Sequence, residues 1–329
     1  MPTDRWMVSG DVLALTDPLA WVLLGLFGGG VLAERRSSGL ARYVVGAAWA
    51  LFAAFWLLLV PFFFYAQNSI LEAVLALVGV PACLYAGYLV VDGRDSLFVL
   101  SRAVAVMGLI YLPAETFTPV RRLLVEHVAA QTHLLMDALG YDPTLRRIGP
   151  DRPAYEGFLA AFHFETADPD HAGIVYNIVM ACTALGSMAI FAGCIAAVRA
   201  PWRRKLQALG VAIPVIYVLN IVRTTFIGLA FGHQWFDGWY TPYVLAVFGE
   251  SDPYMVSHVI AEGVLSQFLS LVALVAIAWY VIRVLPELLV IVDDVAYMVT
   301  GEDRDTAAEL GLLPDEVDGR HPEPSRADD

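Results

Sequence analysis

The sequence predicts an all-α polytopic membrane protein with about seven transmembrane helices. An extracytoplasmic amphipathic segment is expected between the fourth and the fifth. Of the 329 residues, 58% are hydrophobic and 16% are charged, whereas roughly 25% are charged in soluble proteins. The mean hydropathy is +0.64. Several apolar runs reach the ~20 residues that a helix needs to cross a bilayer core of about 30 Å.

Seven apolar runs are long enough to form these spans. They are expected at residues 18–34, 42–64, 69–91, 97–114, 172–198, 206–230 and 255–284. The runs are separated by charged or turn-forming sequences, such as ERR after the first run and DGRD after the third. Residues 1–299 are therefore expected to form one integral membrane domain.

The less apolar residues 115–170 form the extracytoplasmic insert of that domain. Its first part, PVRRLLVEHVAAQTHLLMDALG, has apolar residues near helical spacing: Leu124, Val128, Leu134, Leu135 and Leu139. Arginine, glutamate and histidine occupy the other side, which predicts an amphipathic helix lying on the outer membrane surface. Gly140 is the expected C-terminal cap of this helix. The remainder is expected to be loop-like, with short hairpins at most.

The basic residues indicate how the chain is oriented in the membrane. Loops after the first, third and fifth spans contain ERRSSGLAR, DGRD and VRAPWRRK, whereas YAQNS and the loop over residues 231–254 contain no arginine or lysine. Because basic loops stay in the cytoplasm, the N-terminus is expected outside and the C-terminus inside. Residues 300–329 lack apolar periodicity and are expected to form an acidic, disordered cytoplasmic tail.

The charge composition favours a particular source. The formal net charge is −13, and Lys205 is the sole lysine in the chain. An acidic surface poor in lysine suits a salt-rich cytoplasm, where salt screens the repulsion between carboxylates. A haloarchaeal protein of the cell membrane is therefore expected. A GC-rich genome alone would also replace lysine with arginine, and this alternative stays open.

Three reactive side chains lie inside apolar runs. They are Cys182, Arg223 and His258. At a rise of 1.5 Å per residue they lie about 15, 10 and 8 Å below the outer surface. All three are thus expected in the outer half of the bilayer, on consecutive spans. Ionisable groups at such depths are costly and mark functional sites.

The chemistry of these three groups is coherent. A cysteine thiolate is a nucleophile, and a histidine can act as its general base. An arginine can stabilise a developing oxyanion without losing its proton. Glu262 lies four residues after His258 and could orient the ring, and Asn220 lies three residues before Arg223. The prediction is a cysteine-based catalytic site with these two supporting residues.

Each of these residues also has a structural interpretation. Taken alone, Cys182 would be a small packing residue, as Cys83 and Cys194 are expected to be. Arg223 could pair with a lipid phosphate by snorkelling, and His258 could be a polar residue of the membrane rim. The remaining histidines are expected to be surface groups: His127, His133, His163, His171 and His233.

No cofactor, metal or nucleic acid is expected. The cysteines and histidines show no metal-binding spacing. The chain lacks the HExxH motif of zinc proteases, a Walker A loop and a dinucleotide-binding loop. The glycine and serine of ALGSMA lack the surroundings of a serine nucleophile elbow.

Three motifs together carry a resemblance to a known family. MACTALGSMAIF around Cys182, NIVRTTF around Arg223 and SHVIAEG around His258 resemble the exosortase/archaeosortase family of membrane transpeptidases, in particular its archaeal branch. Thr183 and Ala184 stand where bacterial members tend to have serine and glycine, which favours the archaeal branch.

The resemblance implies a reaction. Cys182 would attack a peptide bond in the C-terminal tripartite sorting signal of a surface protein, of the Pro-Gly-Phe type. A thioester would form, and a phospholipid acceptor would then resolve it. The implied partners are membrane-anchored substrates such as S-layer glycoprotein, together with that lipid.

Two other function classes stay open. A transporter or channel subunit would carry polar residues at all depths, whereas the three reactive groups here cluster near one face. A membrane acyltransferase that uses His258 is the other alternative. Labelling of Cys182 by a thiol-reactive substrate analogue would separate these classes.

Overall fold

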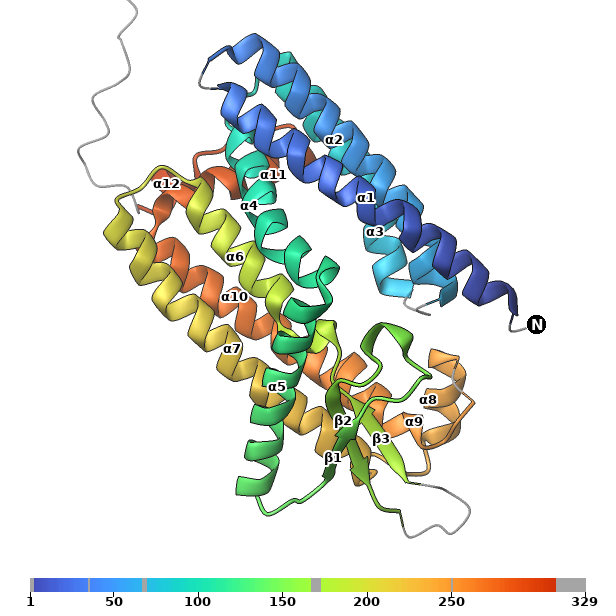
Figure 1. Cartoon of the computed structure of the whole chain (residues 1–329). Helices are drawn as coiled ribbons and strands as arrows, with labels where there is room; N and C mark the ends of the chain where they lie inside the picture. The colour runs from blue at the N-terminus through green and yellow to red at the C-terminus, as the bar shows by residue number, and fades with distance from the viewer. Residues whose placement is uncertain (1–2, 35, 67–69, 167–172, 250, 312–329) are drawn as a thin grey trace, which may run out of the picture.

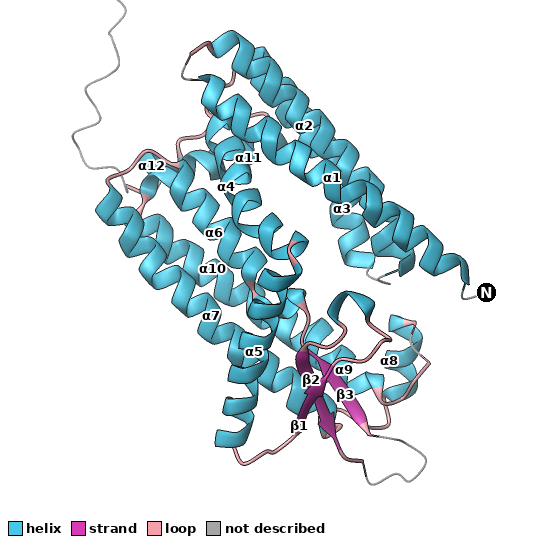
Figure 2. Ribbon diagram, viewed as in Figure 1, coloured by secondary structure: helices cyan, strands magenta, loops and turns pink. Residues whose placement is uncertain are grey.

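The computed structural model describes residues 3–311 except 35, 67–69, 167–172 and 250 (Figure 1). Helices make up most of the described chain, with one small sheet at one end of the bundle (Figure 2). The predicted class is confirmed: the protein is an all-α polytopic membrane protein.

Six helices in the described residues are long and apolar enough to cross a membrane. The first four spans lie in α1 (Thr3–Glu34), α2 (Ser38–Pro61) with its π-helical extension η1 (Phe62–Ala66), α3 (Ile70–Asp92) and α4 (Leu97–Thr116). The other two are α7 (Trp202–Gly232) and a composite helix made of α9 (Met255–His258), the π-helix η4 (Val259–Ser266) and α10 (Gln267–Val284). These six lie close to their predicted positions.

The prediction of one continuous helix over residues 172–198 is wrong. Its residues form the strand β3 (Ile174–Asn177), the 3₁₀ turn η3 (Met180–Thr183) and the short helix α6 (Leu185–Ala197). Ala184 has a left-handed backbone, with φ of 54°, so no regular helix passes through it. The 13 residues of α6 rise only about 20 Å. Pairing of β3 with a neighbouring strand explains why this apolar run is not helical throughout.

The insert begins with the predicted helix, α5 (Thr118–Ala138). Gly140 follows it with φ of +85°, and its N–H donates to the Asp137 carbonyl at 2.9 Å, as the predicted cap requires. The apolar face differs from the prediction, because Leu134 and Leu139 are exposed. The buried face packs against α7 and the sheet and consists of Val125, Val128, Ala129, Thr132 and Met136.

The rest of the insert supplies two strands of an antiparallel sheet, and the run that follows the insert supplies the third; the strand order is β1-β2-β3. The strands are β1 (Thr144–Arg147), β2 (Leu159–Phe164) and β3, with the short turn η2 (Pro153–Tyr155) between the first two. Ala161 pairs with Asn177, and Phe164 pairs with Ile174. The sequence predicted no more than short hairpins in this region, and the structure has a three-stranded sheet instead. The sheet contacts α5 and α7, so it forms part of the core around the residues discussed below.

The basic loops lie at the opposite end of the bundle (Figure 1). There Arg94 of the α3–α4 loop contacts Asp294 at 2.8 Å, and Arg204 pairs with Glu287. The acidic partners belong to η5 (Pro286–Leu288), α11 (Leu289–Thr300) and the residues around them.

The segment expected to be a disordered tail is partly helical. Thr306–Glu309 form the short helix α12, which contacts α11. Residues 312–329 lie outside the described residues.

Candidate active site

Cys182 lies in the turn η3, directly before α6, and not inside a helix as the sequence predicted. The left-handed Ala184 separates the turn from the helix. The turn that carries Cys182 therefore ends directly before the N-terminus of α6. The Cys182 N–H donates to the Val179 carbonyl at 2.9 Å.

Asn220 of α7 fixes the turn from the other side. Its side-chain amide donates to the Cys182 carbonyl at 2.7 Å, and the asparagine is buried. The sequence placed Asn220 beside Arg223, and the structure instead gives it a direct contact with the backbone of Cys182. A buried amide held in this way fixes where the cysteine backbone lies relative to α7.

The side chains of Arg223 and His258 both contact the carboxylate of Glu262. Glu262 accepts from Arg223 Nη2 at 3.3 Å through Oε1 and contacts His258 Nε2 at 2.9 Å through Oε2. The sequence reasoning expected Glu262 to hold the histidine, but not to bridge it to the arginine. The π-helical winding of η4 lies over this part of the composite helix, and π-helical segments frequently occur at functional sites.

The bridge determines which nitrogen of His258 is available. A hydrogen bond to a carboxylate requires Nε2 to carry its proton, so in the neutral ring the lone pair lies on Nδ1. Nδ1 is buried and has no hydrogen-bond partner among the described residues. Phe231 packs against the ring with centroids 4.9 Å apart. In that tautomer Nδ1 is the ring atom left to accept a proton.

Tyr176 of β3 completes the cluster, and the sequence analysis did not single it out. Its hydroxyl interacts with the Cys182 thiol and has no other hydrogen-bond partner among the described residues. The ring lies 6.2 Å from that of His258. No sequence motif marks this residue, because its role depends on β2 and β3 pairing.

Gly228 of α7 makes room for that tyrosine. A Cβ at Gly228 would lie 2.5 Å from Met136 Cε, closer than real contacts allow, and 3.0 Å from the Tyr176 ring, tighter than most real contacts. One turn before it, the hydroxyl of Thr224 lies 2.9 Å from that of Thr132 on α5. The packing of α5 and the sheet on α7 therefore sets the position of Tyr176.

The Cys182 thiol is neutral at rest. Burial raises its pKa, and the negative charge of Glu262 adds to this effect. A hydrogen bond from the Val179 backbone to the thiol, the charge of Arg223 and the Tyr176 hydroxyl act in the opposite direction. Because the increase prevails, the thiol needs a proton acceptor before it can react.

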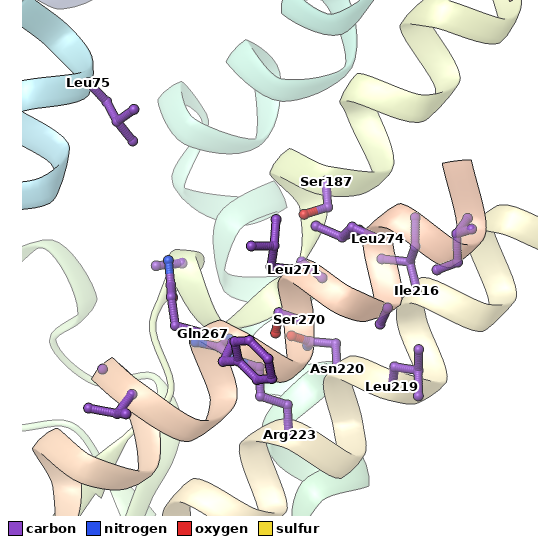
Figure 3. Close-up of a pocket in the computed structure, with 17 residues that line it drawn as sticks. Leu75, Ser187, Ile216, Leu219, Asn220, Arg223, Gln267, Ser270, Leu271 and Leu274 are labelled. Atoms are coloured by element: carbon purple, nitrogen blue, oxygen red, sulfur yellow. The ribbon is translucent and has the colours of Figure 1, made fainter. Parts of the chain in front are cut away.

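The cluster opens onto a cavity of about 840 Å³. Arg223 and Asn220 lie at its wall, together with residues of α6 and α10 (Figure 3). Cys182 is itself buried, whereas its neighbour Ala181 lines this space. The cavity is therefore the route by which a reactant could reach the cluster.

The other candidate residues lie elsewhere. Cys83 belongs to the core of α1–α3, and Cys194 packs at the α6–α10 contact. His127, His133, His163 and His233 are partly or largely exposed, and His171 lies outside the described residues. No group of histidine, cysteine and carboxylate side chains in the described chain has the geometry to hold a metal ion.

Comparison with known proteins identifies relatives along most of the chain. The profile of the family described as Transmembrane exosortase matches residues 15–249. Archaeosortase A of Haloferax volcanii is 48% identical over 308 residues, covering 91% of this chain and 98% of that protein. Archaeosortase A of Natronomonas pharaonis is 44% identical over 291 residues, covering 88% of this chain and 90% of that protein.

No solved structure matches the chain. The profile match covers well over half of the residues, and both relatives align over nearly their whole length. The resemblance carried by the three motifs is thereby confirmed: the chain belongs to the transmembrane exosortase family.

Proposed function

We propose that this protein is a membrane cysteine transpeptidase that processes proteins with C-terminal sorting signals and transfers them to a membrane lipid. The observation that carries the proposal is the placement of a buried cysteine beside the Arg223–Glu262–His258 cluster. The names of the two relatives, both archaeosortase A, support the same class of reaction. A Pro-Gly-Phe signal and a phospholipid acceptor are the substrates that the resemblance implies.

The first half of the reaction forms a thioester. The Cys182 proton passes to Nδ1 of His258, which has the available lone pair, and the thiolate attacks the scissile carbonyl. Arg223 and the Tyr176 hydroxyl stabilise the oxyanion. When the tetrahedral intermediate collapses, the C–N bond breaks and the leaving amine takes the proton from His258. The C-terminal helix of the substrate is then released.

The second half reverses these roles. A nucleophilic group of a lipid headgroup loses its proton to His258 and attacks the thioester. The C–S bond breaks, and the Cys182 thiol recovers its proton. The product is a surface protein joined to a lipid. No step needs an oxidant, a metal or a cofactor.

The proposed orientation places this site in the outer half of the membrane, with the N-terminus outside and the acidic end in the cytoplasm. The short helix α8 (Thr241–Phe248) lies at the same end as the sheet. Next to it Trp239 is 83% exposed, and Tyr243 within it is 68% exposed. Exposed aromatic residues of this kind are typical of a membrane–water interface.

A reporter protein tests the function. The reporter ends in a Pro-Gly-Phe motif, an apolar helix and a cluster of arginines, followed by an epitope tag. Co-expression with this chain in a haloarchaeal strain lacking its own enzyme is expected to remove the tag and to attach a lipid mass. A transporter predicts an unchanged reporter, and an acyltransferase predicts lipid attachment with the tag retained.

The proposed role of Tyr176 gives a further prediction. Tyr176→Phe keeps the ring that packs on Gly228 but removes the hydroxyl. The rate of reporter cleavage is expected to fall roughly 10- to 100-fold, as for the loss of an oxyanion donor. The hydroxyl also lowers the pKa of the Cys182 thiol, so its loss should move the alkaline-rising limb of the pH–rate profile to higher pH.

Tyr217→Phe is the matched control. Its hydroxyl is also buried without a hydrogen-bond partner among the described residues, but its ring stacks on His127, outside the cluster. This variant should keep the wild-type rate and pH profile. A Tyr176→Phe enzyme with an unshifted profile and full rate would exclude a role in stabilising the thiolate or the oxyanion.

A further inference from the structure

The cavity beside Arg223 continues far beyond the catalytic cluster. Its wall on α7 runs from Arg223 to Ile216, and its wall on α10 runs from Gly263 of η4 to Ile277. The α10 side covers 14 residue steps, or about 21 Å at helical rise. That length is most of a bilayer core of about 30 Å. The space is thus a long groove with the catalytic cluster at one end.

The walls of the groove come from several spans. Helix α6 contributes Ser187, and α3 contributes Leu75 from the facing bundle (Figure 3). Most of the other lining residues are apolar, including Leu219, Leu271 and Leu274. Because α7 and α10 are both membrane spans, the groove lies at membrane depth and an apolar occupant would leave lipid to enter it.

Polar groups interrupt this apolar lining. The side chains of Ser187, Gln267 and Ser270 line the groove and hydrogen-bond to no residue in the described part of the chain. A hydrocarbon chain would leave such groups unpaired at membrane depth, which is costly. Between membrane helices, serine and glutamine side chains hydrogen-bond to groups on the neighbouring helix, so the lining fits a polypeptide helix better than a lipid tail.

Gly263 marks the place where a second helix can approach. A Cβ there would meet only one atom, Phe248 Cε1 at 4.0 Å, so packing within the chain does not require a glycine. A glycine in a helix is destabilising relative to alanine. In membrane helices, small residues let the backbones of neighbouring helices come close. Gly263 directly follows Glu262 of the cluster.

We propose that this groove is the docking site for the transmembrane helix of the substrate. The helix lies along α7 and α10, and the peptide segment before it reaches Arg223 and the turn of Cys182. This inference rests on the proposed function. The groove is continuous with the catalytic cluster through Arg223, Asn220 and Ala181, so a helix seated in it delivers its outer end to the thiol.

Photocrosslinking tests the docking site. A photoreactive amino acid is placed at Leu274, which lines the groove, in full-length protein that also carries Cys182→Ala to keep the substrate uncut. The control position is Val272, which is 52% exposed on the same helix but does not line the groove. A crosslink to the helix of the reporter is expected from position 274, with at least a tenfold lower yield from position 272. Equal yields, or crosslinks from position 274 to lipid alone, would overturn the inference.

A pair of glycine substitutions provides a second test. Gly263→Leu fills the groove next to the cluster, and it is expected to lower cleavage at least tenfold and to remove the crosslink at position 274. Gly210→Leu is its control, because Gly210 on α7 also has open space around it but lies outside the groove. Full cleavage and an undiminished crosslink in Gly263→Leu would exclude the site. Cleavage of the reporter by the wild-type protein, measured in parallel, tests the proposed function independently of the docking site.

Discussion

Replacing Cys182 with alanine is expected to abolish reporter cleavage while the protein still inserts into the membrane at normal abundance. In the proposed mechanism the thiol supplies the bond-forming electron pair, and no other cysteine of the chain lies in the cluster. Loss of a nucleophile lowers rates by several orders of magnitude, so a drop of at least roughly 10⁴-fold is expected. Cleavage is measured by loss of the epitope tag, and insertion by the amount of protein in washed membranes.

Cys194→Ala is the matched control for this experiment. It removes a thiol from α6, the helix that follows Cys182, but from its far end against α10. This variant should cleave the reporter at the wild-type rate. Normal maturation of the reporter by Cys182→Ala would refute thioester chemistry.

Arg223→Lys is expected to cut the cleavage rate by about 10²- to 10³-fold, the usual cost of losing an oxyanion donor. Lysine keeps the charge but not the planar fork, with which Arg223 contacts Glu262 while presenting other N–H groups to the groove. In this structure Nη2 makes the Glu262 contact at 3.3 Å. The rate is measured on purified enzyme in lipid vesicles with saturating reporter.

Arg122→Lys serves as the control for that substitution. Arg122 also pairs with a glutamate, Glu126 of the same helix at 2.9 Å, but it lies outside the cluster. A surface pair of this type contributes about 0–1 kcal/mol, so activity should not change. Wild-type activity of Arg223→Lys would show that a point charge is sufficient and would remove the oxyanion role from the guanidinium.

The sequence predicted most of the helical architecture correctly because spans of about 20 apolar residues are a direct consequence of bilayer thickness. The same criterion, the length of an apolar run, wrongly predicted a continuous membrane helix over residues 172–198. An apolar run buried in protein has the same composition as one buried in lipid. Only the pairing of β3 with β2, a contact between separate segments, makes this run a strand and a turn.

The candidate site, like the fold, was predicted only in part. Residue types were enough to single out Arg223 and His258, because charged groups are rare in apolar helices. Cys182 was singled out only together with them and with the family resemblance, and the depth predicted for it assumed a continuous helix that the structure does not have. Tyr176 could not be found in this way, since tyrosine is common in strands. The bridging position of Glu262 depends on how α7 packs against η4, which no spacing within one helix reveals.

The shortness of α6 has a consequence for what happens to the acyl group after the first bond is broken. A helix of 13 residues cannot carry its first residue across the bilayer, so the turn that bears Cys182 stays within the body of the protein, where it is buried. In the proposed reaction the thioester therefore forms in buried surroundings where water is scarce. Under that proposal, exclusion of water would slow hydrolysis of the thioester, so a short α6 would favour transfer over hydrolysis.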